Sequence, residues 1–275
     1  MKLRLSLLVT IPAVIAGCTK IDSHLGESSD FRFEQSMEWN RTHSAREIVV
    51  QSDDYTIMAA ADSHVGTTGN LDSFFRIASA SNVSAVLMSG DLTSGRSEDY
   101  AVFEEHLPDR DSMNIFLSAG NHDLWYDGWD EFSARFGSSS YYITVKTPEA
   151  NDLIICIDTG SGTLGDYQME WLRKILETVR PEYRHCMVFT HNNFFRVNQN
   201  LISNPPVEEL ESLIELFTKS NVEMVFTGHD HKRDATLFGN TTYLQVSALK
   251  DGEEEAGYCK INVKKDKLDY EFRNL

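Results

Sequence analysis

The segment NIFLSAGNHD, residues 114–123, joins a short apolar run to four residues that a strand does not favour. The apolar run predicts a buried strand, and Gly120 allows the backbone to turn sharply after it. Asn121, His122 and Asp123 then follow at the strand's end, where α/β sheets place their chemistry. An amide oxygen can ligate a hard metal, an imidazole can ligate or transfer a proton, and a carboxylate can orient that imidazole.

Four other segments repeat this pattern of an apolar strand, a turn and then a polar ligand type. Their strands are predicted at residues 55–61, 85–89, 186–190 and 222–227, and the polar endings are Asp62 with His64, Asp91, His191, and His229 with His231. Five of the nine histidines lie in the five endings. Carboxylate, amide oxygen and imidazole without thiolate suit Mn, Fe or Zn. The donors exceed what one tetrahedral ion uses, so the set predicts two divalent metal ions that share a carboxylate.

The segments between these endings read as alternating helices and strands. Helices are predicted at residues 71–80, 98–106, 166–179 and 207–219, and further strands at 31–39, 141–146, 153–158, 234–238, 241–246, 257–263 and 267–272. This alternation predicts an α/β fold. A single polar residue at a strand end is more often hydrogen-bonded within a turn than bound to a metal. The prediction of a metal site therefore depends on the ordered set of five endings.

The ordered motifs D-x-H, G-D, G-N-H-D, H and G-H-x-H resemble those of the calcineurin-like metallophosphoesterases, over roughly residues 55–246. The resemblance implies a metallophosphoesterase-type two-sheet β-sandwich flanked by helices. It implies a first metal on Asp62, His64 and His231, a second on Asn121, His191 and His229, and Asp91 as the bridge. It also implies that His122 faces the substrate and that Asp123 positions it.

A centre of this kind implies hydrolysis of a small phosphoester by a hydroxide that bridges the two metals, with His122 stabilising or protonating the leaving group. The segment GDLTSG at residues 90–95 and the acidic, aromatic stretch after it are similar to the cyclic-nucleotide phosphodiesterase-like branch of the family. We therefore expect a phosphodiesterase-like activity. The alternatives are a phosphomonoesterase or nucleotidase of the same fold, and a metal-binding lipoprotein without turnover.

Residues outside the motifs could contribute to substrate binding. Lys232, Arg233 and Arg196 follow metal-ligand motifs and could bind phosphate, although solvated surface charge is an equal alternative. The aromatic cluster Trp125, Tyr126 and Trp129 could stack a base, although core or cap packing is the commoner role of such residues.

The net charge of the chain argues against one class of binding partner, nucleic acid. The 275-residue chain carries a formal net charge of −17, which argues against a broad basic face for extended nucleic-acid binding. No Gly/Ser-rich linker divides the catalytic part, so residues 31–275 are predicted to form one catalytic domain.

The N-terminus reads as a targeting segment. Lys2 and Arg4 precede an apolar stretch at residues 5–16, which is shorter than the roughly 20 residues of a membrane span. The ending IAGC at residues 15–18 resembles a bacterial lipobox. We therefore expect residues 1–17 to be a lipoprotein signal peptide, Cys18 to be lipidated, and residues 18–30 to form a polar tether. This predicts an extracytoplasmic, membrane-anchored lipoprotein; a plain secretory signal is the alternative.

The other three cysteines lie in apolar, strand-like runs without metal-ligand spacing. Cys156, Cys186 and Cys259 are predicted to be buried, unpaired thiols. A Cys156–Cys186 disulfide is the alternative in an oxidising compartment.

Overall fold

The computed structural model of the protein describes residues 27–109, 111–195 and 206–275. The helices are α1 (Ser29–Thr42), α2 (Gly69–Ala80), α3 (Ser97–Glu105), α4 (Gly128–Phe136), α5 (Gly165–Thr178) and α6 (Val207–Lys219), with short 3-10 segments at His122–Asp127 and Arg180–Glu182. Within the described ranges, none of these helices combines the length and apolar character needed to cross a membrane. The predicted signal peptide, Cys18 and Arg196 lie outside the described residues.

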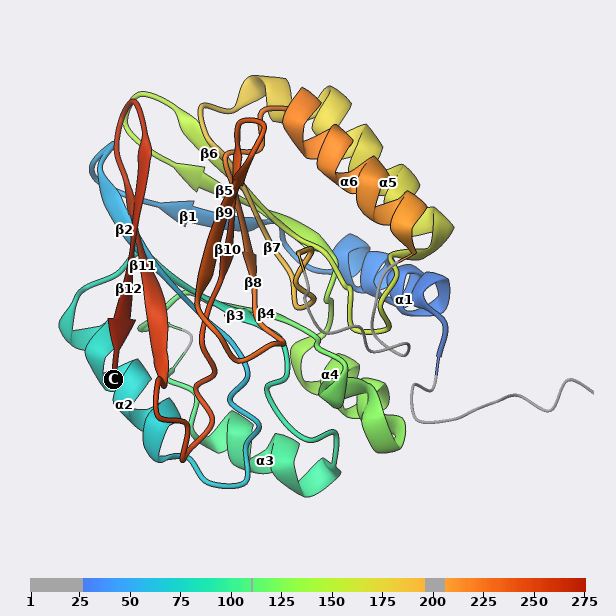
Figure 1. The fold of residues 1–275 in the computed structure, drawn as a ribbon, viewed down its shortest axis with the longest axis vertical. Coiled ribbons are helices and arrows are strands. Elements are labelled where there is room, and N and C mark those ends of the chain that lie inside the picture. The colour runs from blue at the N-terminus through green and yellow to red at the C-terminus, as the bar shows by residue number, and fades with distance from the viewer. Residues whose placement is uncertain (1–26, 110, 196–205) are drawn as a thin grey trace, which may run out of the picture.

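In the described part of the chain, twelve strands form two sheets that pack face to face (Figure 1). The strands are β1 (Arg46–Val49), β2 (Tyr55–Ala60), β3 (Ala85–Ser89), β4 (Ile115–Ser118), β5 (Tyr141–Lys146), β6 (Asn151–Cys156), β7 (Cys186–Phe189), β8 (Met224–Thr227), β9 (Asp234–Phe238), β10 (Thr241–Gln245), β11 (Gly257–Val263) and β12 (Leu268–Asn274). The seven-stranded sheet has the order β1-β5-β6-β7-β8-β10-β9, and the five-stranded sheet has the order β12-β11-β2-β3-β4. Strands β2, β3 and β4 are parallel, as are β6, β7 and β8, so the carboxyl ends of each set lie at one sheet edge.

Apolar side chains on both faces of the central strands create the layers. In β2, Ile57 and Ala59 join the core between the sheets, whereas Met58 and Ala60 join the core under α2, α3 and α4. The helices α5 and α6 cover the outer face of the seven-stranded sheet. Because successive residues of a strand point to opposite faces, runs that are apolar throughout are buried on both sides. The structure thus confirms the predicted two-sheet sandwich flanked by helices.

The strand predicted at residues 31–39 was wrong, because these residues belong to α1. Ser28 caps this helix by accepting a hydrogen bond from the amide of Phe31 at 3.2 Å. Its buried residues are Ser29, Arg32, Phe33 and Ser36, which recur at the helical spacing of three and four. Most of that buried face is polar, so apolar periodicity could not reveal it. The helix also takes residues 29 and 30 out of the predicted tether.

Cys156, Cys186 and Cys259 are free, buried thiols, as their apolar surroundings predicted. The sheet explains why the alternative Cys156–Cys186 disulfide does not form. Cys156 on β6 points into the core between the sheets, and Cys186 on β7 points into the core under α5 and α6. Two side chains on opposite faces of one sheet cannot be joined by a single S–S bond.

Candidate active site

Loops after five strands converge at one end of the sandwich and are joined through their backbones. The amide of Asp62 donates to the carbonyl of Gly90 at 3.0 Å, and the amide of His64 donates to the carbonyl of Asp91 at 3.0 Å. From the other sheet, the amide of Gly228 donates to the carbonyl of His191 at 2.9 Å. Because each loop satisfies its neighbour's polar groups, their side chains are held in fixed positions.

The backbone of these loops is strained where the predicted ligands lie. Five of the seven predicted ligands have a positive φ: Asp62 (55°), His64 (40°), Asp91 (49°), His229 (79°) and His231 (54°). Such conformations cost non-glycine residues of order 1–3 kcal/mol each and persist only where the surroundings enforce them. The strain is therefore concentrated on the residues whose side chains the sequence predicted to share one site.

Glycines permit the close approach of the turns that follow β3 and β4. A Cβ on Gly120 would lie 2.2 Å from Asp91 Oδ1, and a Cβ on Gly90, whose φ is +78°, would lie 2.7 Å from the amide nitrogen of Gly120. No other residue type would fit at Gly120 without displacing Asp91. The close approach of these two turns brings Asp91 next to the residues that follow Gly120.

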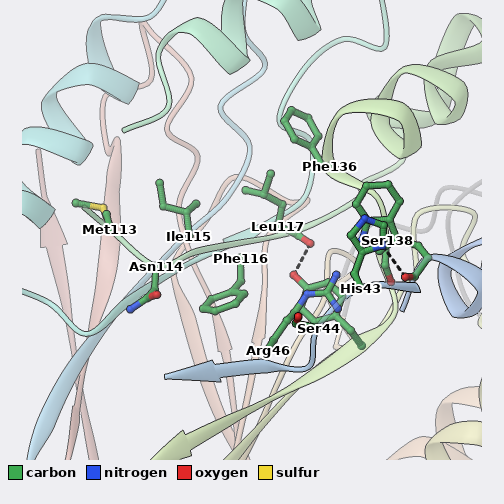
Figure 2. Close-up of a pocket in the computed structure, with 12 residues that line it drawn as sticks. His43, Ser44, Arg46, Met113, Asn114, Ile115, Phe116, Leu117, Phe136 and Ser138 are labelled. Atoms are coloured by element: carbon green, nitrogen blue, oxygen red, sulfur yellow. Dashed lines mark hydrogen bonds between the residues drawn. The ribbon is translucent and has the colours of Figure 1, made fainter. Parts of the chain in front are cut away.

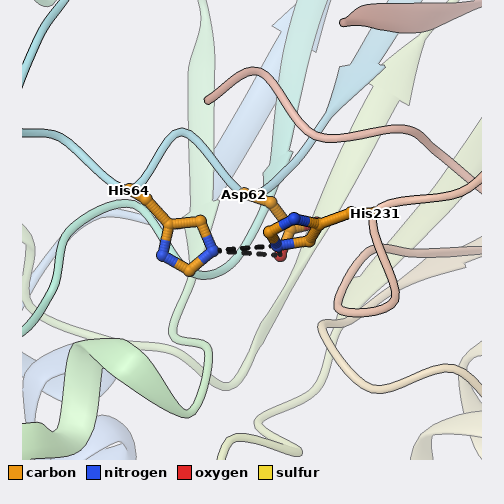
Figure 3. A group of neighbouring side chains, drawn as sticks. All are labelled: Asp62, His64 and His231. Carbon is orange, nitrogen blue, oxygen red and sulfur yellow. Dashed lines mark hydrogen bonds and ion pairs between the residues drawn. The ribbon is translucent and has the colours of Figure 1, made fainter. Parts of the chain in front are cut away.

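Asp62, His64 and His231 form the first cluster of possible ligands (Figure 3). His64 Nε2 lies 3.0 Å from His231 Nε2, and Asp62 Oδ1 lies 3.9 and 3.6 Å from these two nitrogens. Nitrogens that are each about 2.0–2.1 Å from a shared ion would be separated by about 3 Å. The Nδ1 atom of His231 faces Glu253 Oε1 at 3.2 Å, which places a proton on Nδ1 and leaves Nε2 as a donor for a cation.

Asn121, His191 and His229 form the second cluster. His191 Nε2 lies 3.1 Å from Asn121 Oδ1 and 2.9 Å from His229 Nδ1. His191 Nδ1 faces the carbonyl of Ser89 at 2.9 Å, so the carbonyl fixes the proton on Nδ1 and points the Nε2 lone pair at the cluster. The side chain of His191 is fully buried, which makes this orientation rigid.

Asp91 lies between the two clusters. Its Oδ2 atom is 3.7 Å from His64 Nε2 in the first cluster and 3.3 Å from His191 Nε2 in the second. Its Oδ1 atom accepts a hydrogen bond from the amide of His122 at 2.8 Å. One carboxylate oxygen thus faces the donors of both clusters, which is the placement that a bridging ligand requires.

The charges of the site suit bound cations. Burial and repulsion from Asp91 raise the pKa of Asp62 to about 7. Burial also disfavours the charged form of His191, but the carboxylate of Asp91 outweighs it and raises the pKa of His191 to about 9. Burial lowers the pKa of His64 to about 3, which keeps that imidazole neutral and able to ligate. Bound cations would take the place of the proton that His191 holds next to Asp91, and two buried carboxylates with several imidazoles form a donor set that suits divalent metals.

Asp123 does not contact the ring of His122, so the predicted positioning of His122 by Asp123 is not what the geometry shows. The buried carboxylate of Asp123 accepts hydrogen bonds from the amides of Leu92 (3.1 Å), Thr93 (2.9 Å) and Gly120 (2.9 Å). The hydroxyl of Thr93 donates a fourth hydrogen bond at 3.1 Å, so each carboxylate oxygen accepts two. Asp123 therefore joins the loop after β3 to the loop after β4, which is a positioning role for the loops.

His122 is held by neighbouring rings. Its ring centroid lies 3.9 Å from that of Trp125, with 38° between the planes, and 4.6 Å from that of His64, with the planes perpendicular. Among the described residues, its Nδ1 atom has no hydrogen-bond partner. The side chain of His122 also lies next to His64 and Asp91, and these three residues form a further group of possible metal ligands.

A cavity of about 500 Å³ opens beside His64 and His122. Trp125, Tyr126 and two cationic residues, Arg96 and Lys250, also line it. Neither cation belongs to any of the five motifs, so no local sequence pattern points to either of them. Only their position in the folded chain brings them to this cavity.

Arg233, one of the cations that the sequence suggested, lies elsewhere, as does one of the three aromatics. Arg233 donates to Ser247 Oγ at 3.2 Å and to the carbonyl of Arg273 at 3.0 Å, so it ties the C-terminal strands together. Trp129 is 1% exposed and donates its indole N–H to Gln35, which makes it a core residue.

A second cavity, of about 290 Å³, lies between α1, β1 and the edge strand β4 (Figure 2). Arg46 stacks on Tyr141 there with its guanidinium 3.9 Å from the ring centroid, and the hydroxyl of Tyr141 donates to the carbonyl of Leu117 at 2.8 Å. None of the seven predicted ligands lines this cavity. The chemistry is therefore assigned to the strand-end site.

The family model of the calcineurin-like phosphoesterases matches residues 55–233, a span that holds every predicted metal ligand. The chain belongs to the calcineurin-like phosphoesterase family. The clustered ligands of this family member support binding of divalent metal. No curated protein sequence matches the chain significantly.

Solved structures share the fold at low sequence identity. A dimetal phosphatase from Danio rerio is 12% identical, with a TM-score of 0.63, over 80% of this chain and 96% of the other. GAP50, described as the anchor in the inner membrane complex of Plasmodium, is also 12% identical, with a TM-score of 0.63, over 80% and 84% of the two chains. A phosphatase from Mycoplasma pneumoniae is 12% identical, with a TM-score of 0.51, over 81% and 93%. Identities this low establish a common fold, and function must be argued from the site.

Proposed function

We propose that the protein is a dinuclear metal-dependent phosphoesterase that acts on small phosphoesters, with a preference for diesters. The position of Asp91 carries the proposal, because one of its oxygens faces donors of both ligand clusters. A site for one ion would not need a shared carboxylate between two sets of imidazoles.

In this proposal Asp62, His64 and His231 hold one cation, Asn121, His191 and His229 hold the other, and Asp91 contacts both. Two divalent cations would supply charge for the phosphoryl oxygens and activation of a water molecule. The protein's own part is to fix the donors, which the strained loops and the hydrogen bonds of His191 to Ser89 and of His231 to Glu253 support.

His122 would stabilise or protonate the leaving oxygen. Its place at the wall of the 500 Å³ cavity beside His64 supports this role. Burial lowers the pKa of His122, so proton donation would require the nearby phosphoryl group to favour the charged imidazole. Trp125 limits the ring's freedom and would keep it directed at the leaving group.

The preference for diesters rests on the same cavity. A phosphate monoester places one organic group on phosphorus and a diester places two, so space beside the site favours the larger substrate. The test is hydrolysis of bis(4-nitrophenyl) phosphate and 4-nitrophenyl phosphate by the purified protein with Mn²⁺. Measurable diester cleavage is expected, and monoester cleavage without any diester cleavage would reverse the preference.

Asp91→Asn tests the dinuclear assignment. A neutral amide bridges two cations poorly, so this variant should lose at least one metal equivalent and most activity. Asp269→Asn, on β12 and paired with Lys267, makes the same chemical change away from the site and is the matched control. A variant at Asp91 with full metal content and near-normal turnover would contradict the assignment.

We further propose that the protein is a membrane-anchored, extracytoplasmic lipoprotein, on the basis of Lys2, Arg4 and the ending IAGC at residues 15–18. One lipid chain gives marginal membrane binding, and two or more anchor a protein stably. This would hold the site near small phosphoesters outside the cytoplasm. The strongly acidic chain makes extended nucleic acid an unsuitable substrate.

A further inference from the structure

The cavity beside His122 has an aromatic wall formed by Trp125 and Tyr126. Their ring centroids lie 6.4 Å apart with the planes at 87°, and Tyr126 is 60% exposed. A cavity of about 500 Å³ falls in the range of sites that bind small organic molecules, about 300–1,000 Å³. A planar group could therefore lie against these rings while its ester phosphorus reaches the ligand clusters.

The aromatic wall is maintained in a strained conformation. Tyr126 and Asp127 are consecutive non-glycine residues with positive φ, of 54° and 64°. Gly95 permits this conformation, because a Cβ there would lie 2.5 Å from the carbonyl oxygen of Trp125. The hydroxyl of Tyr100 donates to the carbonyl of Asp123 at 2.7 Å and fixes the start of the segment. Strain that neighbouring groups enforce is typical of ligand-binding segments.

Lys250 supplies a positive charge on another wall of the same cavity. Its amide donates to the carbonyl of Asp62 at 2.9 Å, so its backbone is tied to the loop of a ligand. The next residue, Asp251, accepts from the amides of Gly69 and Asn70 at 3.0 and 2.7 Å, which fixes the segment further. Among the described residues, no carboxylate lies within ion-pair distance of the ammonium of Lys250.

The other cation of the cavity, Arg96, is already partnered, and two carboxylates, Glu98 and Asp99, also line the cavity. Arg96 places its guanidinium 5.3 Å from the ring centroid of Tyr126 and 4.0 Å from Glu98 Oε1. Asp99 accepts a hydrogen bond from the hydroxyl of Ser94. Lys250 is therefore the cation of this cavity that is open to a ligand.

We infer that this cavity is a leaving-group subsite for phosphoesters whose leaving group combines a planar ring with a negative charge. The inference rests on the proposed phosphoesterase function and names its substrate class. The ring would pack against Trp125 and Tyr126, and the anion would pair with Lys250. The strongly acidic remainder of the chain would repel such a group, so a local cation is needed to accept it.

The test compares two substrates that differ in one charge, the methyl phosphodiesters of 4-hydroxybenzoate and 4-hydroxybenzamide. The ratio of their kcat/KM values is measured with Mn²⁺ for the wild type, Lys250→Met and Lys219→Met. Lys219 lies at the end of α6 and pairs with Glu215, so its variant removes the same charge away from the cavity. Intrinsic leaving-group reactivity cancels when the ratio of one enzyme is divided by that of another.

We expect the carboxylate-to-amide ratio to fall by about fivefold in Lys250→Met, which is the effect of one partly exposed ion pair. The ratio should not change in Lys219→Met. An unchanged ratio in Lys250→Met, or an equal fall in both variants, would overturn the role of Lys250.

Direct binding separates failure of the subsite from failure of the proposed function. Binding of free 4-hydroxybenzoate and 4-hydroxybenzamide is followed through tryptophan fluorescence, which needs no turnover. The wild type should bind the acid more tightly than the amide, Lys250→Met should lose that preference, and Tyr126→Ala should weaken both. If neither ester is cleaved but these differences hold, the subsite stands and the hydrolytic proposal fails; equal binding of both probes by the wild type would overturn the subsite.

Discussion

Replacing Gly120 with alanine should disable the site through a single methyl group. The added Cβ would lie 2.2 Å from Asp91 Oδ1 and 2.3 Å from the Asp91 amide nitrogen. Non-bonded heavy atoms are in favourable contact at about 3.5 Å, so Asp91 or Gly120 must move by about 1 Å. A displacement of this size at a catalytic centre can cost about 10²-fold in rate.

The measurements are metal content after gel filtration and hydrolysis of bis(4-nitrophenyl) phosphate with Mn²⁺. We expect Gly120→Ala to bind fewer metal ions and to lose about 10²-fold in kcat/KM, with its far-UV circular dichroism unchanged. Gly66→Ala is the matched control, because the nearest atom to a Cβ there is the carbonyl oxygen of His64 at 4.0 Å. Full metal content with activity close to that of the wild type in Gly120→Ala would refute the bridging position of Asp91.

Four further changes test separate parts of the molecule. His122→Ala should keep both metals and lose about 10²–10⁴-fold in rate, mainly for esters with poor leaving groups; an equal loss for aryl and alkyl esters would argue against proton donation. Arg32→Met leaves the buried carboxylate of Asp158 unpaired and should lower the free energy of unfolding by about 3–5 kcal/mol in urea titrations. A loss below about 1 kcal/mol would contradict the stabilising role of the Arg32–Asp158 ion pair. Cys18→Ser should abolish incorporation of labelled fatty acid, and equal labelling of both proteins would exclude the lipid anchor. Burial disfavours the charged form of His185, but Glu223 outweighs this effect and raises the pKa of His185, so the pair stabilises the fold below the unfolded-state pKa of about 6.5. The excess stability of the wild type over Glu223→Gln should therefore shrink as the pH rises from about 6.5 through the raised pKa, and a constant excess would contradict the pairing.

The predicted ligands carry a local sequence signal that the residues around them lack. Each of them follows a continuous apolar run and a turn, a pattern that predicts a position at the end of a buried strand. Lys250 and Arg96 have no such local signal, because the fold alone brings them beside His122. The same limit explains Asp123, whose partners are backbone amides on another loop and not the neighbouring ring that local order suggested.

The helices and strands were predictable wherever their buried side chains are apolar. Strands such as β3 (Ala85–Ser89) are buried throughout, and the predicted bounds match the structure. Helix α1 was missed because its inward face carries Arg32, Ser29 and Ser36, whose burial depends on distant partners. Arg32 pairs with Asp158 at 2.8 Å across 126 residues of sequence, a contact that no local pattern reveals.

The two sheets divide each ligand cluster between them. Asp62 and His64 follow a strand of the five-stranded sheet, and their partner His231 follows one of the seven-stranded sheet. His191 and His229 belong to the seven-stranded sheet, and Asp91 to the other. Each ion would therefore cross-link the two sheets of the sandwich. Its full set of ligands comes together only after the two sheets have packed against each other. Because an unfolded chain cannot offer both halves at once, metal should raise the melting temperature in proportion to the logarithm of its free concentration.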